Sequence, residues 1–264
     1  MNIKMIVTDL DRTLLRNDKT ISDFTVSTFL RLKAMGIKVV FATARPIRSV
    51  KTLPCVATIS PDAIIYHNGA VVTVEGNHHI SYGIPHETAK SILLTAASRF
   101  PDARMSVEIS DTLYANFEFP KEEGLDWSCV LSDFTDLPAH FADKLVFSPP
   151  HDDMPLDDTL INGIKSLLPD GLYAVPSEDR LLLVMAKTAV KHLAVAKVAG
   201  YFGLTPADAV AFGDDYNDIE MLQECGIGVA VSNAIEEVKA VSDFICDSNE
   251  NDGVAKWLGQ NLLF

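Results

Sequence analysis

The chain has 264 residues, of which 48% are hydrophobic and 22% charged, without low-complexity tracts or internal repeats. A chain of this size and composition can bury a sizeable core, which excludes a disordered protein and fits one large or two modest domains. Its formal net charge of −14 repels nucleic acid and anionic membranes, so we expect neither as a partner.

The spacing of the cysteines and the length of the apolar segments indicate in which cellular compartment the protein is expected. Four scattered cysteines without Cys-X-X-Cys spacing argue against a zinc site and a disulfide framework; they are Cys55, Cys129, Cys225 and Cys246. The apolar stretch Met5–Val7 is too short for a signal peptide, and no run approaches the roughly 18 apolar residues of a membrane span. We expect a cytoplasmic protein with reduced thiols, acting as a monomer or a weak homodimer.

The first part of the chain alternates apolar strands with a helix. Ser22 can cap a helix whose apolar residues recur at helical spacing until Gly36 ends it. Nearly continuous apolar runs are typical of strands covered on both faces in a parallel sheet, and a polar turn between two runs predicts a hairpin. The predicted strands are Lys4–Thr8, Ile37–Ala42, Ala63–Tyr66, and the hairpin pair Val71–Val74 and His79–Tyr82.

The last part of the chain resumes this alternation. A helix is predicted over Lys191–Phe202 and another through Ile219, Met221 and Leu222, with strands at Ala209–Phe212 and Ile227–Val231. Strands that alternate with helices at both ends of the chain predict an α/β fold with a doubly wound parallel sheet.

The middle of the chain has a different pattern, in which consecutive strands follow a helix. The predicted elements are a helix around residues 89–96, strands at Met105–Ile109, Leu113–Phe117 and Lys144–Phe147, a helix near Leu160–Leu167, and strands at Leu172–Val175 and Leu181–Val184. We interpret residues 84–185 as an α+β domain with an antiparallel sheet, inserted into a core formed by residues 1–83 and 186–264.

Polar residues gather where the predicted core strands end. Carboxyl ends of parallel strands meet at one edge of a sheet, where ligands of open α/β folds bind. Several carboxylates there would repel one another without a cation, and ligation by oxygens alone suits Mg²⁺. The polar residues at these ends are Asp9, Asp11, Thr13, Thr43, Asn68, Asp214 and Asp218.

These motifs resemble the haloacid dehalogenase-like (HAD) superfamily. Asp9–Leu15 resembles its DxDxT signature, while Thr43, Lys191 and Gly213–Asp218 are similar to its other three motifs in order. The order and spacing are similar to the Cof-type sugar-phosphatase branch, which carries a large α/β cap between the second and third motifs. Further matching stretches are Tyr66–Ala70, Ile227–Ala230, Ser232–Ala234 and Asp252–Ala255. The resemblance covers the core, whereas the cap matches only in length and element order.

The resemblance implies a role for each acidic residue. Asp9 is expected to be the nucleophile that forms an aspartyl-phosphate, and Asp11 the general acid–base whose backbone carbonyl also binds the metal. Asp214 is expected to bind Mg²⁺ together with Asp9, and Asp218 to contribute directly or through water. Asp215 is as well explained by a solvated loop charge as by a metal ligand.

The same resemblance implies a phosphate-binding set. Thr43 would hold a phosphoryl oxygen as a neutral donor and Lys191 as a point charge, although Lys187 is a nearby alternative for the lysine. The chain departs from the family pattern at Arg12 and His192, where glycine is usual, which puts inherited substrate preference in doubt. The whole predicted phosphate- and substrate-binding set is Thr43, Arg45, Asn68, Gly69, Lys191 and Asn217.

The resemblance therefore implies a Rossmann-like core with an inserted cap, acting as a Mg²⁺-dependent phosphoric monoester hydrolase on a small phosphorylated metabolite. The substrate could be a sugar phosphate, a nucleotide-derived phosphate or a phosphorylated cofactor, with the cap setting the choice. Two alternatives stay open on sequence alone. A sugar phosphomutase uses similar motifs, and a non-catalytic regulatory binding protein could keep the same fold.

Overall fold

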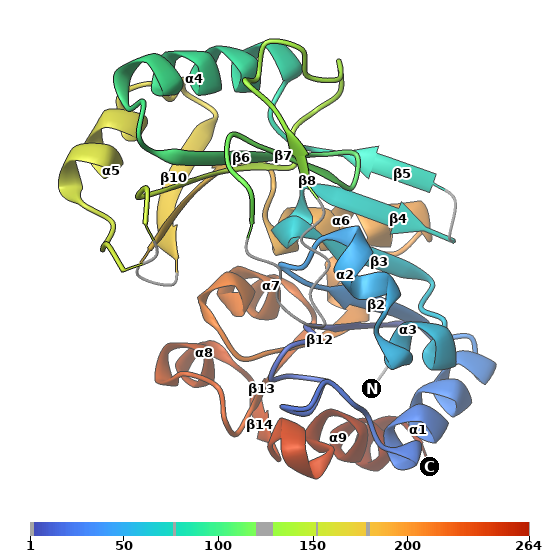
Figure 1. Cartoon of the computed structure of the whole chain (residues 1–264). Coiled ribbons are helices and arrows are strands. Elements are labelled where there is room, and N and C mark those ends of the chain that lie inside the picture. Colours follow the sequence, from blue (N-terminus) through green and yellow to red (C-terminus); the bar gives the residue numbers. More distant parts are fainter. Residues whose placement is uncertain (1–2, 76–77, 120–128, 152, 178–179, 264) are drawn as a thin grey trace. The chain divides into compact units, whose positions relative to one another are not determined.

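The computed structural model describes residues 3–75, 78–119, 129–151, 153–177 and 180–263. The chain forms two compact units, a core unit of residues 1–80 with 190–264 and an insert unit of residues 81–189 (Figure 1). The boundaries predicted from the sequence lie within four residues of these divisions.

The core unit is built on an eight-stranded sheet. Its central strand, β1, pairs in parallel with β12 on one side and β2 on the other. All strands from β14 to β3 run parallel, which confirms the predicted doubly wound sheet, while β4 runs antiparallel to β3 at one side. The strand order is β14 (Phe244–Cys246), β13 (Ile227–Val231), β12 (Ala209–Gly213), β1 (Met5–Thr8), β2 (Lys38–Ala42), β3 (Ala63–Tyr66), β4 (Val71–Val74) and β5 (His78–Ser81).

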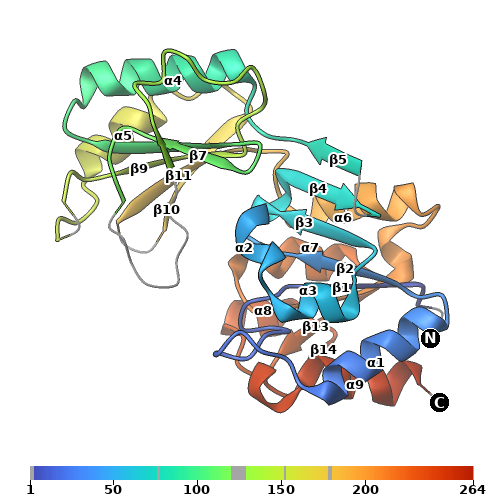
Figure 2. The same cartoon turned by 45° about the vertical axis from the view of Figure 1, so that its right-hand side comes forward.

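Helices of the core unit pack in two groups. α1 packs against α3 and α9, whereas α7 packs against α6 and α8, and the two groups cover opposite faces of the sheet (Figure 2). The side chains of β1 and β12 are buried along their whole lengths, as the continuous apolar runs predict. The core helices are α1 (Asp23–Ala34), α2 (Ile47–Lys51), α3 (Pro54–Ile59), α6 (Lys191–Tyr201), α7 (Ile219–Glu224), α8 (Glu236–Val241) and α9 (Gly253–Leu262).

In its described residues, the insert unit holds a six-stranded sheet with two helices, α4 (His86–Arg99) and α5 (Asp158–Lys165). The strands that the sequence predicted pair antiparallel, as expected, whereas β8, which was not predicted, pairs in parallel with β7. The segment between β7 and β8 is long enough for the crossover that a parallel pair requires. The strand order is β10 (Leu172–Ser177), β11 (Leu181–Ala186), β9 (Lys144–Ser148), β6 (Arg104–Ile109), β7 (Thr112–Ala115) and β8 (Cys129–Leu131).

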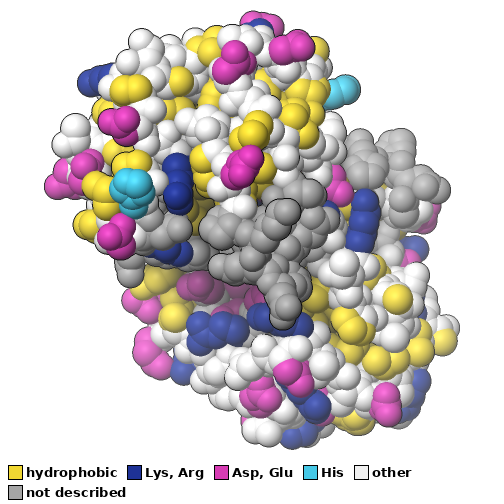
Figure 3. All heavy atoms as spheres, viewed as in Figure 1, with side chains coloured by type: hydrophobic (Ala, Val, Ile, Leu, Met, Phe, Trp, Pro, Cys, Tyr) yellow, Lys and Arg dark blue, Asp and Glu magenta, His cyan; other side chains and the backbone are white. Residues whose placement is uncertain are grey.

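The surface agrees with the acidic composition. Asp and Glu side chains are scattered over the visible face, with Lys and Arg among them, rather than gathered in one patch (Figure 3). In the described part of the chain, none of the helices has the length and hydropathy needed to cross a membrane.

Candidate active site

The predicted site residues of the core unit gather at the carboxyl ends of its central strands. Asp9 follows β1, Thr43 follows β2, and Asp214 follows β12. In the parallel register Thr8 lies beside both Phe41 and Phe212, so the three strands end at the same level. The backbone N–H of Asp9 donates to the carbonyl of Phe212 at 3.0 Å, which fixes the start of the loop after β1.

Three buried carboxylates form the centre of the site. Ligand oxygens of Asp9, Asp214 and Asp218 lie within 4.8 Å of one another. Burial raises the pKa of Asp9, against the opposing effect of Lys191 and with a further contribution from the charge of Asp218. Burial also raises the pKa of Asp214 to about 6, although Thr13 donates a hydrogen bond to its carboxylate at 2.7 Å. The cluster therefore carries more negative charge than its surroundings neutralise.

Lys191 supplies the buried positive charge. It is the first residue of α6 and is 1% exposed. Its ammonium donates to Asp9 at 2.6 Å and to Asp218 at 2.7 Å. Burial disfavours the charged form, but Asp218 and Asp9 outweigh that effect and raise the pKa of Lys191. The alternative lysine, Lys187, is exposed and belongs to the insert unit.

The loop after β12 is folded around Asp218. One carboxylate oxygen of Asp218 accepts the backbone N–H groups of Asp214, at 3.0 Å, and Asp215, at 3.3 Å. Asp215 itself is exposed and accepts from the N–H of Tyr216. A Cβ at Gly213 would lie 2.4 Å from the Cβ of Asp218, so only glycine leaves room for Asp218 in this position.

The loop after β2 connects Thr43 to Asp11 through Arg45. The hydroxyl of Thr43 accepts the backbone N–H of Arg45 at 3.1 Å, which leaves its own hydrogen available to a ligand. The guanidinium of Arg45 donates two hydrogen bonds to the Asp11 carboxylate, at 2.5 and 2.7 Å. Lys19 also donates to Asp11, at 2.8 Å. Burial favours neutral Asp11, but the hydrogen bonds from Arg45 and Lys19 prevail and lower its pKa.

A second polar pair comes from the turn after β3. Asn68 has a positive φ of 56°, and its side-chain oxygen accepts from the amide of Asn217 at 2.8 Å. Gly69 lies against the backbone of Val190, the residue before Lys191, so a Cβ there would come within 2.6 Å of the Val190 carbonyl oxygen. The hydrogen bond between Asn68 and Asn217 therefore orients both side chains, and the absence of a side chain at Gly69 allows the turn to approach the start of α6.

Arg12 and His192, the two departures from the family pattern, contact different parts of the core unit. Arg12 has a φ of +60°, is exposed, and its Nε lies 3.9 Å from a carboxylate oxygen of Asp214. His192 faces Glu224 instead, with 3.8 Å between its Nε2 and a carboxylate oxygen. Sequence reasoning did not single out Lys19, because nothing in the local pattern indicates that this residue contacts Asp11.

The donor set fits a magnesium ion. Three buried carboxylates lie close together, and burial, with a further contribution from the charge of Asp218, raises the pKa values of Asp9 and Asp214. Mg²⁺ prefers oxygen ligands and binds proteins through one or a few carboxylates. Asp9, Asp214 and Asp218 are the residues that would hold it.

The sequence as a whole matches a known family. The sequence model of the haloacid dehalogenase-like hydrolase family matches residues 6–258, nearly the entire chain. The chain belongs to this family. The motifs at Asp9–Leu15 and Gly213–Asp218, which suggested the resemblance, both fall inside the matched range.

Individual relatives agree with the family match. The chain is 28% identical over 266 residues to the 5-amino-6-(5-phospho-D-ribitylamino)uracil phosphatase YitU of Bacillus subtilis, covering 96% of each chain. The crystal structure of TM0651 from Thermotoga maritima is 26% identical, with a TM-score of 0.83 over 98% of this chain and 97% of that one.

A more distant structure shares the fold. The HAD subclass IIB sugar phosphatase BT4131 is 22% identical, with a TM-score of 0.74 over 97% of this chain and 98% of that one. The family match and the relatives named as phosphatases make the chain a phosphatase, that is, a phosphoric monoester hydrolase.

Proposed function

We propose that the protein is a magnesium-dependent phosphatase that hydrolyses small phosphomonoesters through a phosphorylated Asp9. The observation that supports it best is the buried cluster of Asp9, Asp214 and Asp218 with Lys191 at the carboxyl ends of the central strands. A bound magnesium ion would offset the charge of these carboxylates and of the phosphate oxygens.

The side chains of the core unit divide the reaction between them. Asp9 attacks the phosphorus atom, forming a carboxylate–phosphorus bond as the bond from phosphorus to the leaving oxygen breaks. Lys191, Thr43 and Asn217 hold the phosphoryl oxygens so that the attack is in line. Holding the reacting groups in place is most of what a protein can contribute to phosphoryl transfer.

Asp11 moves the proton in both halves of the reaction. As an acid it gives a proton to the leaving oxygen, and as a base it takes one from the water that attacks the phosphorylated Asp9. Its ionised form is the one needed in the second half, and the lowered pKa of Asp11 favours that form. The two steps together return both aspartates to their starting states and release alcohol and phosphate.

The substrate is proposed to be a small metabolite with a sugar-like or sugar-alcohol phosphate, selected by the insert unit of residues 81–189. Support comes from the relative of Bacillus subtilis, whose name states that it acts on a phosphorylated ribityl compound. Polar substitutions in the insert unit should change discrimination among sugar phosphates more than turnover of p-nitrophenyl phosphate.

Metal dependence gives the first experiment. Phosphate release from a panel of metabolites should stop in EDTA and return with Mg²⁺, while Ca²⁺, with its looser coordination, should support little turnover. Full turnover in EDTA would contradict the proposal.

Pre-steady-state kinetics give the second experiment. Asp9→Asn should abolish turnover of every substrate, since an amide cannot accept the phosphoryl group as a carboxylate does. Asp11→Asn should slow sugar phosphates by roughly 10²–10⁴-fold, because an alkoxide needs a proton to leave. With p-nitrophenyl phosphate the same variant should release a burst of nitrophenolate while phosphoenzyme accumulates. Equal slowing on both substrates, without a burst, would remove Asp11 from the acid–base role.

A further inference from the structure

The Asp11 carboxylate is held by two cations of the core unit. Arg45 donates to Oδ2 through Nε and to Oδ1 through Nη2, and Lys19 donates to Oδ1 as well. Oδ1 therefore accepts two hydrogen bonds and Oδ2 one. Among these contacts, Oδ2 keeps a free lone pair, so it is the oxygen better able to carry a proton.

Lys19 reaches Asp11 from a tight turn. The N–H of Arg16 donates to the carbonyl of Thr20 and the N–H of Lys19 to the carbonyl of Arg16, while the carboxylate of Asp18 accepts both the N–H and the hydroxyl of Thr20. Within this turn Lys19 has a φ of +67°. That region is unfavourable for a residue with a Cβ, so placing a lysine here has a cost.

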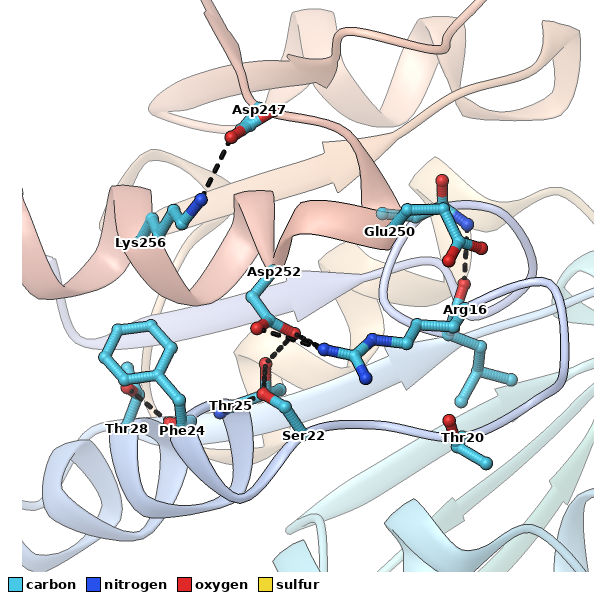
Figure 4. Close-up of polar contacts among 12 residues, drawn as sticks. Arg16, Thr20, Ser22, Phe24, Thr25, Thr28, Asp247, Glu250, Asp252 and Lys256 are labelled. Carbon is cyan, nitrogen blue, oxygen red and sulfur yellow. Dashed lines mark hydrogen bonds and ion pairs between the residues drawn. The ribbon is translucent and has the colours of Figure 1, made fainter.

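This turn is anchored from the far side. Arg16 pairs with the carboxylate of Asp252 at 3.2 and 3.3 Å, beside Ser22 and Thr25 (Figure 4). The N–H of Asn17 donates to Glu250 at 2.8 Å, and Asn249 donates to the carbonyl of Leu15 at 2.9 Å. The turn of residues 15–20 is thus fixed to residues 249–252, so the backbone that carries Lys19 is held in place.

Stability does not explain this arrangement. The side chains of Lys19 and Asp11 are 45% and 33% exposed, and ion pairs this exposed contribute little to folding. A left-handed lysine offsets even that small gain. A strained residue whose contact adds little stability, and whose partner lies at a reaction centre, indicates a role in function.

We propose that Lys19 is a positioning residue that, jointly with Arg45, fixes the Asp11 carboxylate with Oδ2 free to move the proton. The proposal rests on the acid–base role of Asp11 given above. Lys19 acts through Asp11 and does not itself contact the reacting atoms.

The experiment removes the Lys19 ammonium in two ways. Lys19→Met keeps the length of the side chain, and Lys19→Gly relieves the positive φ, so the second variant folds at least as readily as the wild type. Lys4→Met is the matched control, because Lys4, just before β1, pairs with Asp208 at the same 2.8 Å and with similar exposure. Lys19→Arg tests whether another cation restores the contact.

Both Lys19 variants should lower kcat on the best sugar phosphate about 10- to 100-fold, the size expected for a displaced catalytic group, with KM nearly unchanged. Formation of the nitrophenolate burst should change little, since that leaving group needs no proton. Lys19→Arg should recover part of the loss, and Lys4→Met should behave as wild type. In an Asp11→Asn background, removing Lys19 should cost nothing more.

Four results would overturn the proposal: an unchanged kcat, a rise in KM alone, an equal slowing of the first phosphoryl transfer on both substrates, or an equal loss in the Asp11→Asn background. Comparing the Asp11→Asn variant with the Lys19 variants distinguishes a failure of the Lys19 proposal from a failure of the proposed mechanism. If Asp11→Asn shows dependence on the leaving group and the Lys19 variants do not, only the role of Lys19 fails. If Asp11→Asn shows none, the acid–base role fails and this proposal with it.

Discussion

The charge of Asp214 leads to a stability prediction that needs no substrate. Asp214 is 4% exposed, and burial raises its pKa from 3.8 to about 6. Between these values the folded protein holds a proton that the unfolded chain has released, so stability falls as the pH rises from about 4 to about 6. The shift is about two pKa units at about 1.4 kcal/mol each, so ionised Asp214 costs the metal-free fold up to about 3 kcal/mol.

Asp214→Asn should remove that cost. Asparagine keeps an oxygen that can accept the hydrogen bond from Thr13, and it has no charge to desolvate. We expect the variant in EDTA, at about pH 7.5, to have a Tm roughly 4–10 °C above that of the wild type. Magnesium should raise the Tm of the wild type and leave that of the variant nearly unchanged, since a ligand stabilises only a fold that binds it.

Thermal unfolding followed by circular dichroism between about pH 5 and pH 8, with EDTA or Mg²⁺, measures these effects. Asp215→Asn is the matched control, because Asp215 is the exposed neighbour in the same loop and should give no gain in EDTA. A variant Tm at or below the wild-type value in EDTA, or a wild-type Tm indifferent to magnesium, would refute the reasoning about the charge cluster.

Two further substitutions test the packing of the site. Lys191→Met should lower kcat by about 10²–10³-fold. In EDTA it should also destabilise the fold by about 3–5 kcal/mol, because Asp9 and Asp218 lose their buried partner. The control Lys187→Met, at an exposed position, should change neither kcat nor the midpoint of urea unfolding. Gly213→Ala should displace Asp218, whose Cβ lies 2.4 Å from the added methyl, and lower kcat at least about tenfold while weakening magnesium binding measured by calorimetry. An alanine variant with wild-type kinetics and metal affinity would show that Asp218 can shift freely.

Long apolar runs made the core sheet predictable. Ala63–Tyr66 and Val71–Val74 form β3 and β4 with the predicted bounds, and the runs before Asp9 and Thr43 form β1 and β2. Side chains buried on both faces leave a continuous signal in the sequence. The doubly wound fold and the family are confirmed, because they depend on this signal and on motifs that fall at the strand ends.

Short or exposed elements were not predicted. α2 and α8 have five and six residues, too few to show a helical period, and Phe244 and Ile245 of the edge strand β14 are exposed. Their conformations depend on tertiary packing more than on local pattern. The parallel pairing of β7 with β8 also left no local signal, since register and direction are set by the neighbouring strand.

Within the site, the sequence predicted which segments meet better than which atoms touch. Asp9, Asp214 and Asp218 were expected at one sheet edge and Lys191 among the phosphate-binding residues, and the structure brings these side chains together. The contacts of Arg45 and Lys19 with Asp11 were not foreseen, because they depend on rotamers and on a left-handed turn. Whether Arg45 also contacts phosphate stays a prediction, as do the roles assigned to the other site residues.

The order of strands in the core sheet has a consequence during synthesis. β1 lies between β2, which ends at Ala42, and β12, which begins at Ala209. The ribosome adds the roughly 170 residues between them in about 10–30 s at typical rates. Throughout that interval one edge of a strand that is wholly buried in the finished fold has no partner of its own, and such edges readily pair with other chains. A nascent chain that ends before Ala209 therefore presents an unpaired edge of β1 that the completed protein does not.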